Sequence, residues 1–260
     1  MTSLAGVVLA AGAGTRLRPL TDLRPKALCP VGGVPLVDLA LARLPVSGPD
    51  DVAVNVHHHA AQLVAHLGGG VHVSVESPEA LGTAGALGLL RPWLDGRDVL
   101  VTNADVYLPG GLPSGFVEGW DGERSRLLCV PAGSRRADFL TPAGAPVRYV
   151  GTCLLPGRSV GTLEAVPSGL YEVLWRDASV DLVALGADAV AIDCGTVTDY
   201  LAANLHASGG DSVIGAGATV LGSVQRSVVW DGAWVGPDEK LTDVVRAGTR
   251  DQPVTARGSD

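Results

Sequence analysis

Residues 4–21 of the 260-residue chain read LAGVVLAAGAGTRLRPLT, an apolar run followed by a glycine-rich segment. The apolar run over residues 4–10, rich in valine and leucine, is typical of a strand that is buried on both faces of a parallel sheet. Gly12 and Gly14 follow the run and allow the backbone to turn sharply. A buried strand that leads into a glycine-rich turn predicts an α/β protein.

Short apolar strands continue along the chain and alternate with stretches rich in alanine and leucine. Further strands are expected at residues 52–56, 71–75, 99–102 and 127–130, and helices at residues 35–44, 60–67 and 83–90. This alternation predicts a Rossmann-like, doubly wound sheet with helices on both faces. Proline and glycine turns over residues 116–155 make the predicted sheet mixed, and a helix at 163–175, a strand at 190–192 and a helix at 200–206 are expected to complete it.

The segment after residue 210 changes character. Aliphatic residues fall six positions apart at Ile214 and Val220, and again at Val229, Val235 and Leu241, with glycines between them. This period predicts a short left-handed β-helix in which each side of a coil points one aliphatic residue inward. A glycine-rich irregular tail is the alternative.

The predicted β-helix has about two coils, which is too few to stand alone. We therefore expect a first, catalytic domain over residues 1–208 and a β-helix stub over residues 211–246 that leans on this domain or on a second copy of the chain. The polar residues 247–260 are expected to form a disordered end.

The composition excludes several classes of protein. The chain has 19 basic and 27 acidic residues and a net charge of −8, which argues against a nucleic acid or an anionic membrane as its main partner. It is 47% hydrophobic but has no apolar run long enough to span a membrane, and its first residues lack the basic stretch of a secretory signal, so a cytoplasmic protein is expected. Its four cysteines show neither metal-ligand nor disulfide spacing and are expected to be reduced thiols.

The turn after the first strand is a candidate phosphate site. Gly12 and Gly14 let the backbone aim successive N–H groups at a phosphate chain, and Arg16 can fork onto phosphate oxygens. The turn is not a Walker loop, because no Gly-Lys-Ser/Thr follows, and Leu17 stands where the third glycine of a dinucleotide fingerprint belongs. The three histidines at residues 57–59 do not predict a metal site, since consecutive strand residues point to opposite faces.

Residues 9–21, 24–31 and 33–36 together resemble the signature of the sugar-1-phosphate nucleotidylyltransferases, the nucleotide-sugar pyrophosphorylases. A glycine turn, Thr-Arg, Pro-Lys and Gly-x-Pro stand in the order that this signature has. Matching segments at residues 54–58, 76–77, 81–86, 103–105 and 193–196 extend the resemblance over residues 4–206. The stub resembles the C-terminal β-helix of the mannose-1-phosphate guanylyltransferases. The resemblance implies a nucleotidyltransferase fold and an enzyme that uses Mg²⁺, a nucleoside triphosphate and a sugar 1-phosphate.

The resemblance also implies roles for individual residues. Arg16 and Lys26 would hold and neutralise the triphosphate, and Asp105 and Asp193 would hold Mg²⁺, so these four are the expected catalytic residues. The expected nucleotide-binding residues are Leu9, Ala10, Ala11, Gly12, Gly14, Thr15, Arg16, Lys26, Gly82, Thr83 and Asn103. Each of the two aspartates follows a strand, and ligands of open α/β sheets gather at the carboxyl ends of strands. Two carboxylates there make a hard oxygen site that suits Mg²⁺.

The acceptor half departs from the family pattern. Most members carry a Glu-Lys-Pro-like motif whose lysine meets the sugar phosphate, but here no lysine lies between Lys26 and Lys240. Arg148 or Arg158 would take its place, with a fork in place of a point charge. The expected substrate-binding residues are Arg148, Gly151 and Glu164.

These features predict transfer of a nucleotidyl group from a nucleoside triphosphate to a sugar 1-phosphate. The Leu-Gly-Thr-Ala-Gly segment and the stub favour mannose 1-phosphate with GTP. One alternative is an enzyme of the N-acetylmuramate-1-phosphate uridylyltransferase type, which shares the Asn-x-His-His-like and Asp-Phe-like features. The other is a catalytically silent, nucleotide-sugar-binding regulatory subunit, against which the retention of four charged site residues argues. A homo-oligomer formed through the stub is a further expectation.

Overall fold

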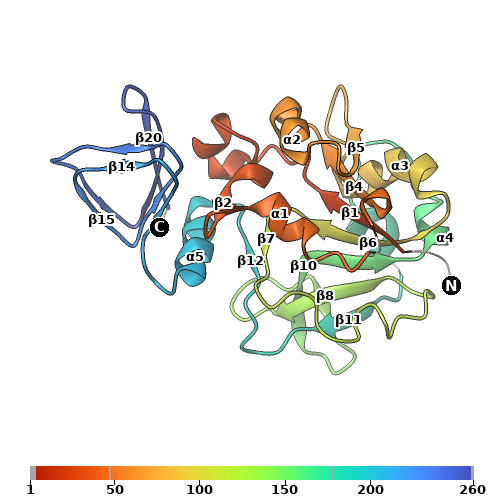
Figure 1. Ribbon diagram of the computed structural model, residues 1–260. Helices are drawn as coiled ribbons and strands as arrows, with labels where there is room; N and C mark the ends of the chain where they lie inside the picture. Colours follow the sequence, from red (N-terminus) through yellow and green to blue (C-terminus); the bar gives the residue numbers. More distant parts are fainter. Residues whose placement is uncertain (1–3, 47, 177, 259–260) are drawn as a thin grey trace.

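The computed structural model describes residues 4–46, 48–176 and 178–258, and a mixed sheet of eight strands forms its centre (Figure 1). The strand order is β11-β8-β10-β6-β1-β4-β5, and β9 pairs with β10 at the side of this path. The bounds of the strands are β1 Leu4–Leu9, β4 Val52–Val56, β5 His72–Val75, β6 Asp98–Asn103, β8 Arg126–Pro131, β9 Phe139–Leu140, β10 Pro146–Leu155 and β11 Asp181–Ala184. The pairs of β1 with β4 and β6 are parallel, whereas β10 runs antiparallel to β6 and β8. The predicted Rossmann-like mixed sheet is therefore confirmed.

Helices cover both faces of the sheet. The main helices are α1 Leu36–Leu41, α2 Ala60–Leu67, α3 Gly82–Leu94, α4 Gly157–Val160 and α5 Val197–Ala207. Ala5 and Val7 of β1 belong to the core under α3, and Val8 belongs to the core under α1 and α2. The alternation of side chains along a buried strand thus fills both layers.

Short elements connect the layers. They are η1 Thr15–Leu17, η2 Leu20–Asp22, η3 Lys26–Leu28, η4 Pro49–Asp51, β2 Pro30–Val31, β3 Val34–Pro35, β7 Val106–Tyr107, η5 Tyr171–Trp175 and β12 Ile192–Asp193. None of the helices among the described residues is long and apolar enough to cross a membrane.

The helix predicted over residues 163–175 is wrong, apart from the single π turn of η5. The chain instead crosses α3 with its backbone close to the helix, and Ser168 exchanges backbone hydrogen bonds with Leu81 and Ala84. A Cβ atom on Gly85 or Gly88 would come closer than 3.0 Å to a carbonyl oxygen of this crossing segment. The glycines of α3 therefore admit a backbone where a helix with side chains would not fit.

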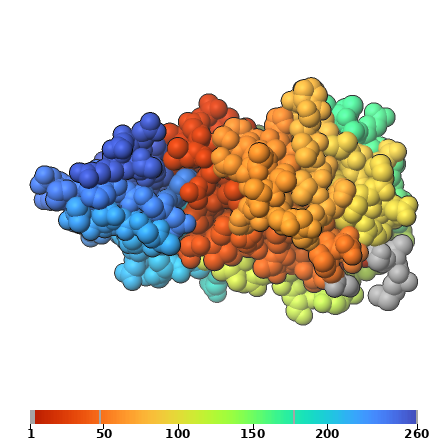
Figure 2. Space-filling model, turned by 45° about the horizontal axis from the view of Figure 1, so that its top comes forward, coloured from red at the N-terminus to blue at the C-terminus, as the bar shows by residue number. Residues whose placement is uncertain are grey.

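The strands after α5 form a separate set of ladders at one end of the molecule (Figures 1 and 2). Their bounds are β13 Val213–Ile214, β14 Thr219–Val220, β15 Ser223–Gln225, β16 Val228–Val229, β17 Trp234–Val235, β18 Lys240–Thr242, β19 Val244–Gly248 and β20 Pro253–Arg257. The pairs β13/β16, β14/β17 and β15/β18 are all parallel, as successive coils of a β-helix require. We refer to residues 213–257 as the C-terminal coil.

Two details of the predicted coil are wrong. Val229, Val235 and Leu241 are buried as expected, but Ile214 and Val220 are 47% and 36% exposed, because no further coil stacks on the outer edges of β13 and β14 in the described part of the chain. The prediction of a disordered end over residues 247–260 is wrong for residues 247–257, since β20 pairs antiparallel with β19 along its whole length. Residues 259 and 260 of that prediction lie outside the described residues. Apolar residues at alternate positions of β20, among them the buried Ala256, give this polar segment a face that packs.

Candidate active site

The glycine-rich turn begins where β1 ends and folds back over Lys26. Gly14 has a φ of 62°, and a Cβ atom there would lie 2.8 Å from Thr21 Cγ2 and 3.1 Å from Lys26 Cβ. Thr21 Oγ1 donates a 2.9 Å hydrogen bond to the carbonyl of Gly14. The turn therefore needs glycine at position 14, both for its left-handed backbone and for the close approach of Lys26.

A pocket of about 190 Å³ opens beside this turn. It is lined by Leu9, Ala11, Gly12, Asn55, Ala80, Gly82, Thr83, Asn103 and Asp105. Six of the eleven residues predicted to bind nucleotide thus come together, although they come from β1 and the turn after it, from α3 and from β6. The other five, Ala10, Gly14, Thr15, Arg16 and Lys26, are not among its lining residues. Ala10 is buried, and Thr15 opens η1.

The four predicted catalytic residues converge at the edge of this pocket. Lys26 Nζ forms an ion pair with Asp105 Oδ2 and lies 3.8 Å from Asp193 Oδ1. Arg16 Nη2 lies 3.8 Å from Asp193 Oδ2. The Lys26 side chain is 12% exposed and that of Arg16 is 67% exposed, so the lysine is a fixed charge and the arginine is free to move onto a ligand.

Backbone pairing holds the two aspartates together. Asp193 of β12 lies opposite Val106 of β7, and the N–H of Cys194 donates a 2.9 Å hydrogen bond to the carbonyl of Asp105. Burial, and next the charge of Asp105, raise the pKa of Asp193 above its ordinary value, against the opposing effect of Lys26 and Arg16. The ionised form of Asp193 is thus disfavoured by its burial and by its neighbour, a cost that a bound cation would offset.

The donor chemistry of these carboxylates fits Mg²⁺. Asp105 and Asp193 face one pocket and offer only oxygen ligands, the type that Mg²⁺ prefers. Two protein carboxylates leave the remaining positions to water and phosphate oxygens, as is usual for this ion.

A second pocket, of about 140 Å³, lies on the other side of Asp105. Its lining includes Asn103, Arg148, Gly151 and Asp193. Gly151 has a φ of 75°, and a Cβ atom on it would lie 2.8 Å from Asn103 Nδ2. Arg148 is half-buried, and its Nε is buried without a hydrogen-bond partner in the described chain, so the guanidinium keeps a donor that no described group uses.

Glu164, predicted to bind substrate, lies elsewhere. It borders a different hollow together with Gly88 and Arg91 of α3, and its carbonyl packs against Gly88. Arg158 is also remote from both pockets, because its guanidinium binds Gly122 and Glu123. Of the two arginines considered for the missing lysine, only Arg148 reaches the site.

The family model described as "Nucleotidyl transferase" matches residues 5–114, the segment that carries the glycine turn, Lys26 and Asp105. This segment, less than half of the chain, matches the nucleotidyl transferase family. The two pockets and the charge cluster are called the nucleotidyl transferase site below, after this match, although Arg148, Gly151 and Asp193 lie outside the matched residues.

Comparisons with individual proteins agree with this family. The chain is 37% identical over 137 residues to an N-acetylmuramate alpha-1-phosphate uridylyltransferase of Caulobacter vibrioides, and the match covers 48% of the chain and 57% of that relative. It is 35% identical over 107 residues to a mannose-1-phosphate guanylyltransferase of Mycobacterium tuberculosis, covering 38% of the chain and 29% of the relative. The chain thus spans about half the length, or less, of these curated relatives.

Solved structures match the fold over a longer stretch. A structure described as mannose-1-phosphate geranyltransferase from Thermus thermophilus superposes with a TM-score of 0.69, at 18% identity, over 98% of this chain and 95% of that one. At this identity the likeness shows the fold, which includes the region of the C-terminal coil.

Asn55 and Glu76 lie in segments that match the family signature, but the sequence alone assigns them no role in the nucleotidyl transferase site. Asn55 Oδ1 accepts a 2.6 Å hydrogen bond from the N–H of Ala10, and Asn55 Nδ2 donates to Glu76 Oε1 at 2.6 Å. Glu76 Oε2 accepts the N–H of Leu81, also at 2.6 Å. Both side chains are buried. They join the start of the glycine turn to the start of α3, the two walls of the first pocket.

Arg43, at the end of α1, is a second residue that the sequence did not reveal. Its guanidinium donates to the carbonyls of Val106 and Asn103 and to Thr102 Oγ1. Burial lowers its pKa to about 10, and Asp105 opposes this shift. Arg43 therefore stays charged at neutral pH and fixes the turn that carries Asp105.

The histidines at residues 57–59 have structural contacts. His57 Nδ1 lies 2.9 Å from the carbonyl of Glu76, and the Nε2 atoms of His58 and His59 lie 3.3 and 3.2 Å from the carbonyl of Thr21. They support the loops around the site.

Proposed function

We propose that this chain transfers a nucleotidyl group from a nucleoside triphosphate to a sugar 1-phosphate and releases pyrophosphate. One observation carries the proposal. The two pockets share Asn103 and Asp105. Lys26 Nζ forms an ion pair with the shared Asp105. A donor and an acceptor bound in adjacent pockets would meet at this charge cluster.

In the proposed reaction, a phosphate oxygen of the sugar 1-phosphate attacks the α-phosphorus of the triphosphate in line. The bond from the α-phosphorus to the bridging oxygen breaks, and pyrophosphate leaves with the electron pair. Lys26 and Arg16 neutralise charge on the transferring group, and the N–H groups of the glycine turn cradle the phosphates. Mg²⁺, held by Asp105 and Asp193, would supply further charge neutralisation. Positioning and charge neutralisation supply most of the rate in such chemistry.

For the substrates, we propose N-acetylmuramate 1-phosphate with UTP before mannose 1-phosphate with GTP. The Leu-Gly-Thr-Ala-Gly segment and the stub alone favour mannose 1-phosphate with GTP. Two relatives named as N-acetylmuramate alpha-1-phosphate uridylyltransferases, 37% and 41% identical, support the other order. They exceed the 35% identity of the guanylyltransferase match.

The test is pyrophosphate release with Mg²⁺ over a grid of nucleoside triphosphates and sugar 1-phosphates. We expect release with UTP and N-acetylmuramate 1-phosphate, and its loss in Asp105→Asn. Asp95→Asn is the matched control, since Asp95 is exposed at the far end of α3 in a left-handed conformation that asparagine accepts. Silence across the grid from a folded protein that still binds nucleotide would favour the silent regulatory subunit.

We also propose that the chain associates with a second copy through the C-terminal coil. The outer edges of β13 and β14 are unpaired within the described chain, and Ile214, Val220 and Leu221 are exposed there. Unpaired strand edges beside apolar side chains favour association. Light scattering should give a dimer or larger for the wild type and a monomer for Leu221→Glu; a monomeric wild type would refute this.

A further inference from the structure

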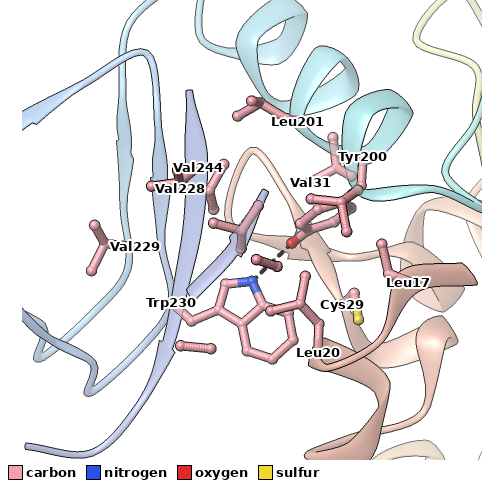
Figure 3. Packing of buried hydrophobic residues seen from close by; sticks show 14 of the residues in the cluster. Leu17, Leu20, Cys29, Val31, Tyr200, Leu201, Val228, Val229, Trp230 and Val244 are labelled. Carbon is pink, nitrogen blue, oxygen red and sulfur yellow. Dashed lines mark hydrogen bonds between the residues drawn. The ribbon is translucent and has the colours of Figure 1, made fainter. Parts of the chain in front are cut away.

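Trp230, between β16 and β17, packs from the C-terminal coil against the first domain. It is 2% exposed and belongs to a core that includes Leu17, Leu20 and Cys29 of the segment around the glycine turn (Figure 3). Its Nε1 donates a 3.0 Å hydrogen bond to the hydroxyl of Tyr200 on α5 (Figure 3). The coil and the segment that carries Lys26 therefore share one core.

The contact continues from Tyr200 to the Lys26 segment. The Tyr200 hydroxyl, fully buried, donates to the carbonyl of Pro30. Asn204, one turn further along α5, also donates to Pro30 and accepts the N–H of Gly32 at 3.1 Å. The carboxyl end of the segment is thus fixed to α5.

The other end of the segment is fixed to the coil directly. The Arg24 guanidinium lies over the Trp230 ring, 4.3 Å from its centroid. Arg24 is two residues before Lys26, and Pro30 is four residues after it. Between these anchors, Lys26 stands on the short 3-10 helix η3 and the segment continues into the two-residue strand β2, so local structure alone leaves the lysine weakly fixed.

We propose that Trp230 and Tyr200 are positioning residues for Lys26, and that the C-terminal coil is a working part of the nucleotidyl transferase site. The inference rests on the proposed function for its kinetic consequence only. A misplacement of about 1 Å at a catalytic group can cost about a hundredfold in rate. Neither residue touches the pockets, so each acts through the position of Lys26 on Asp105.

The first test is a double-mutant cycle on the full chain. Tyr200→Phe removes the hydroxyl that joins Trp230 to Pro30, and Arg24→Leu removes the cation over the ring. Each should lower kcat by about ten- to a hundredfold, while KM for the sugar phosphate changes less than about threefold. In a Lys26→Met background, Tyr200→Phe should lower kcat no further, because its effect passes through Lys26.

The coil offers a matched control. Trp234 also lies in the C-terminal coil and also carries an arginine over its ring, Arg250 at 4.7 Å, but both partners belong to the coil. Trp234→Phe should leave kcat unchanged even where it lowers Tm. If Tyr200→Phe lowers Tm and leaves kcat at low temperature unchanged, or if its effect on kcat adds fully to that of Lys26→Met, the proposal is overturned.

A second readout needs no activity. Lys26 and Lys240 are the only lysines of the chain, so labelling lysine with ¹³C at Cε gives two NMR signals, which Lys240→Arg assigns. The Lys26 signal should shift in Tyr200→Phe and in Arg24→Leu, and stay in place in Trp234→Phe. An unmoved Lys26 signal overturns the positioning role. If the Lys26 signal shifts in these two variants but the wild type releases no pyrophosphate, the positioning role stands and the proposed function is overturned.

Discussion

Asp193 shows, at the scale of one residue, how the site trades stability for ligand binding. Its carboxylate is held near Asp105, and its pKa is raised because burial and then the charge of Asp105 disfavour ionisation. The folded state thus holds the proton more tightly than the unfolded state does. The contribution of this group to stability falls as pH rises from its ordinary pKa of 3.8 through the raised value.

Asparagine at position 193 removes this cost together with the metal ligand. We expect Asp193→Asn to lower pyrophosphate release by about a hundredfold or more, and to have a Tm at neutral pH equal to or above that of the wild type in the absence of divalent cations. The difference in Tm between variant and wild type should grow with pH through the window above 3.8 and then level off. Thermal melts along a pH series measure this, and a variant that is less stable than the wild type at neutral pH would contradict it.

Arg148 is the arginine that we expect to bind the sugar 1-phosphate. It lines the second pocket with an unsatisfied buried Nε, whereas Arg158 is bound to Gly122 and Glu123. Arg148→Met should raise KM for the sugar 1-phosphate by about tenfold or more, as expected for the loss of a charge-assisted hydrogen bond, and change KM for the nucleotide little. Initial rates at varied acceptor concentration test this, with Arg158→Met as the control. The reverse pattern would make Arg158 the acceptor arginine.

At the scale of elements, the sequence predicts a helix or strand best where the local pattern of apolar residues is enough to define it. Most buried strands and the helices α1, α2, α3 and α5 follow from apolar runs and their breaks. Asp105 and Asp193 do meet, but β12, which carries Asp193, pairs with β7 in a ladder of its own and is not the strand of the main sheet predicted at residues 190–192. The prediction of a helix at residues 163–175 is wrong because the glycines of α3 allow the backbone of this segment to lie directly against α3. That contact joins segments about eighty positions apart, which no local pattern encodes.

The same limit explains what was missed in the site. The substrate-binding role of Glu164 is predicted from the family resemblance, but the sequence does not fix the path of its loop. In the structure Glu164 lies against α3, beside a different hollow. Asn55 and Arg43 act through hydrogen bonds to backbone groups of distant strands. A buried asparagine at the end of an apolar strand was the available signal for the first; the sequence offered none for the second.

Strand β20 allows an element-scale test of the segment expected to be disordered. Ala256 is 2% exposed where β20 lies on β19, while its neighbour Thr255 is exposed. Ala256→Glu should lower the free energy of unfolding by about 3 kcal/mol, because it buries a carboxylate without a partner. Thr255→Glu should stay within about 0.5 kcal/mol of the wild type. Denaturant titration measures both, and equal stability of the two variants would mean that β20 does not pack in solution.

At the scale of the whole molecule, two buried cores divide the four cysteines. Cys29 and Cys194 belong to the core that joins the Lys26 segment, α5 and the C-terminal coil, and Cys129 and Cys153 belong to the core between the sheet and α3. Burial is the main cause that raises the pKa of Cys29, Cys129 and Cys153 to about 12. Burial also raises the pKa of Cys194. Thiolate is the reactive form, so all four should be inert in the folded chain at mildly alkaline pH.

The reactivity of these thiols should therefore report how the two cores open. The first core depends on short strands and the coil, whereas the second lies in the continuous ladder of the sheet, so Cys29 and Cys194 should react first in mild denaturant. A nucleotide with Mg²⁺, bound beside Lys26 and Asp193, should slow the labelling of this pair more than that of the sheet pair. Pulsed alkylation with mass spectrometry separates the four sites. Rapid labelling in native buffer would contradict the burial of the thiols, and simultaneous labelling of both pairs would mean that the coil and the sheet unfold as one unit.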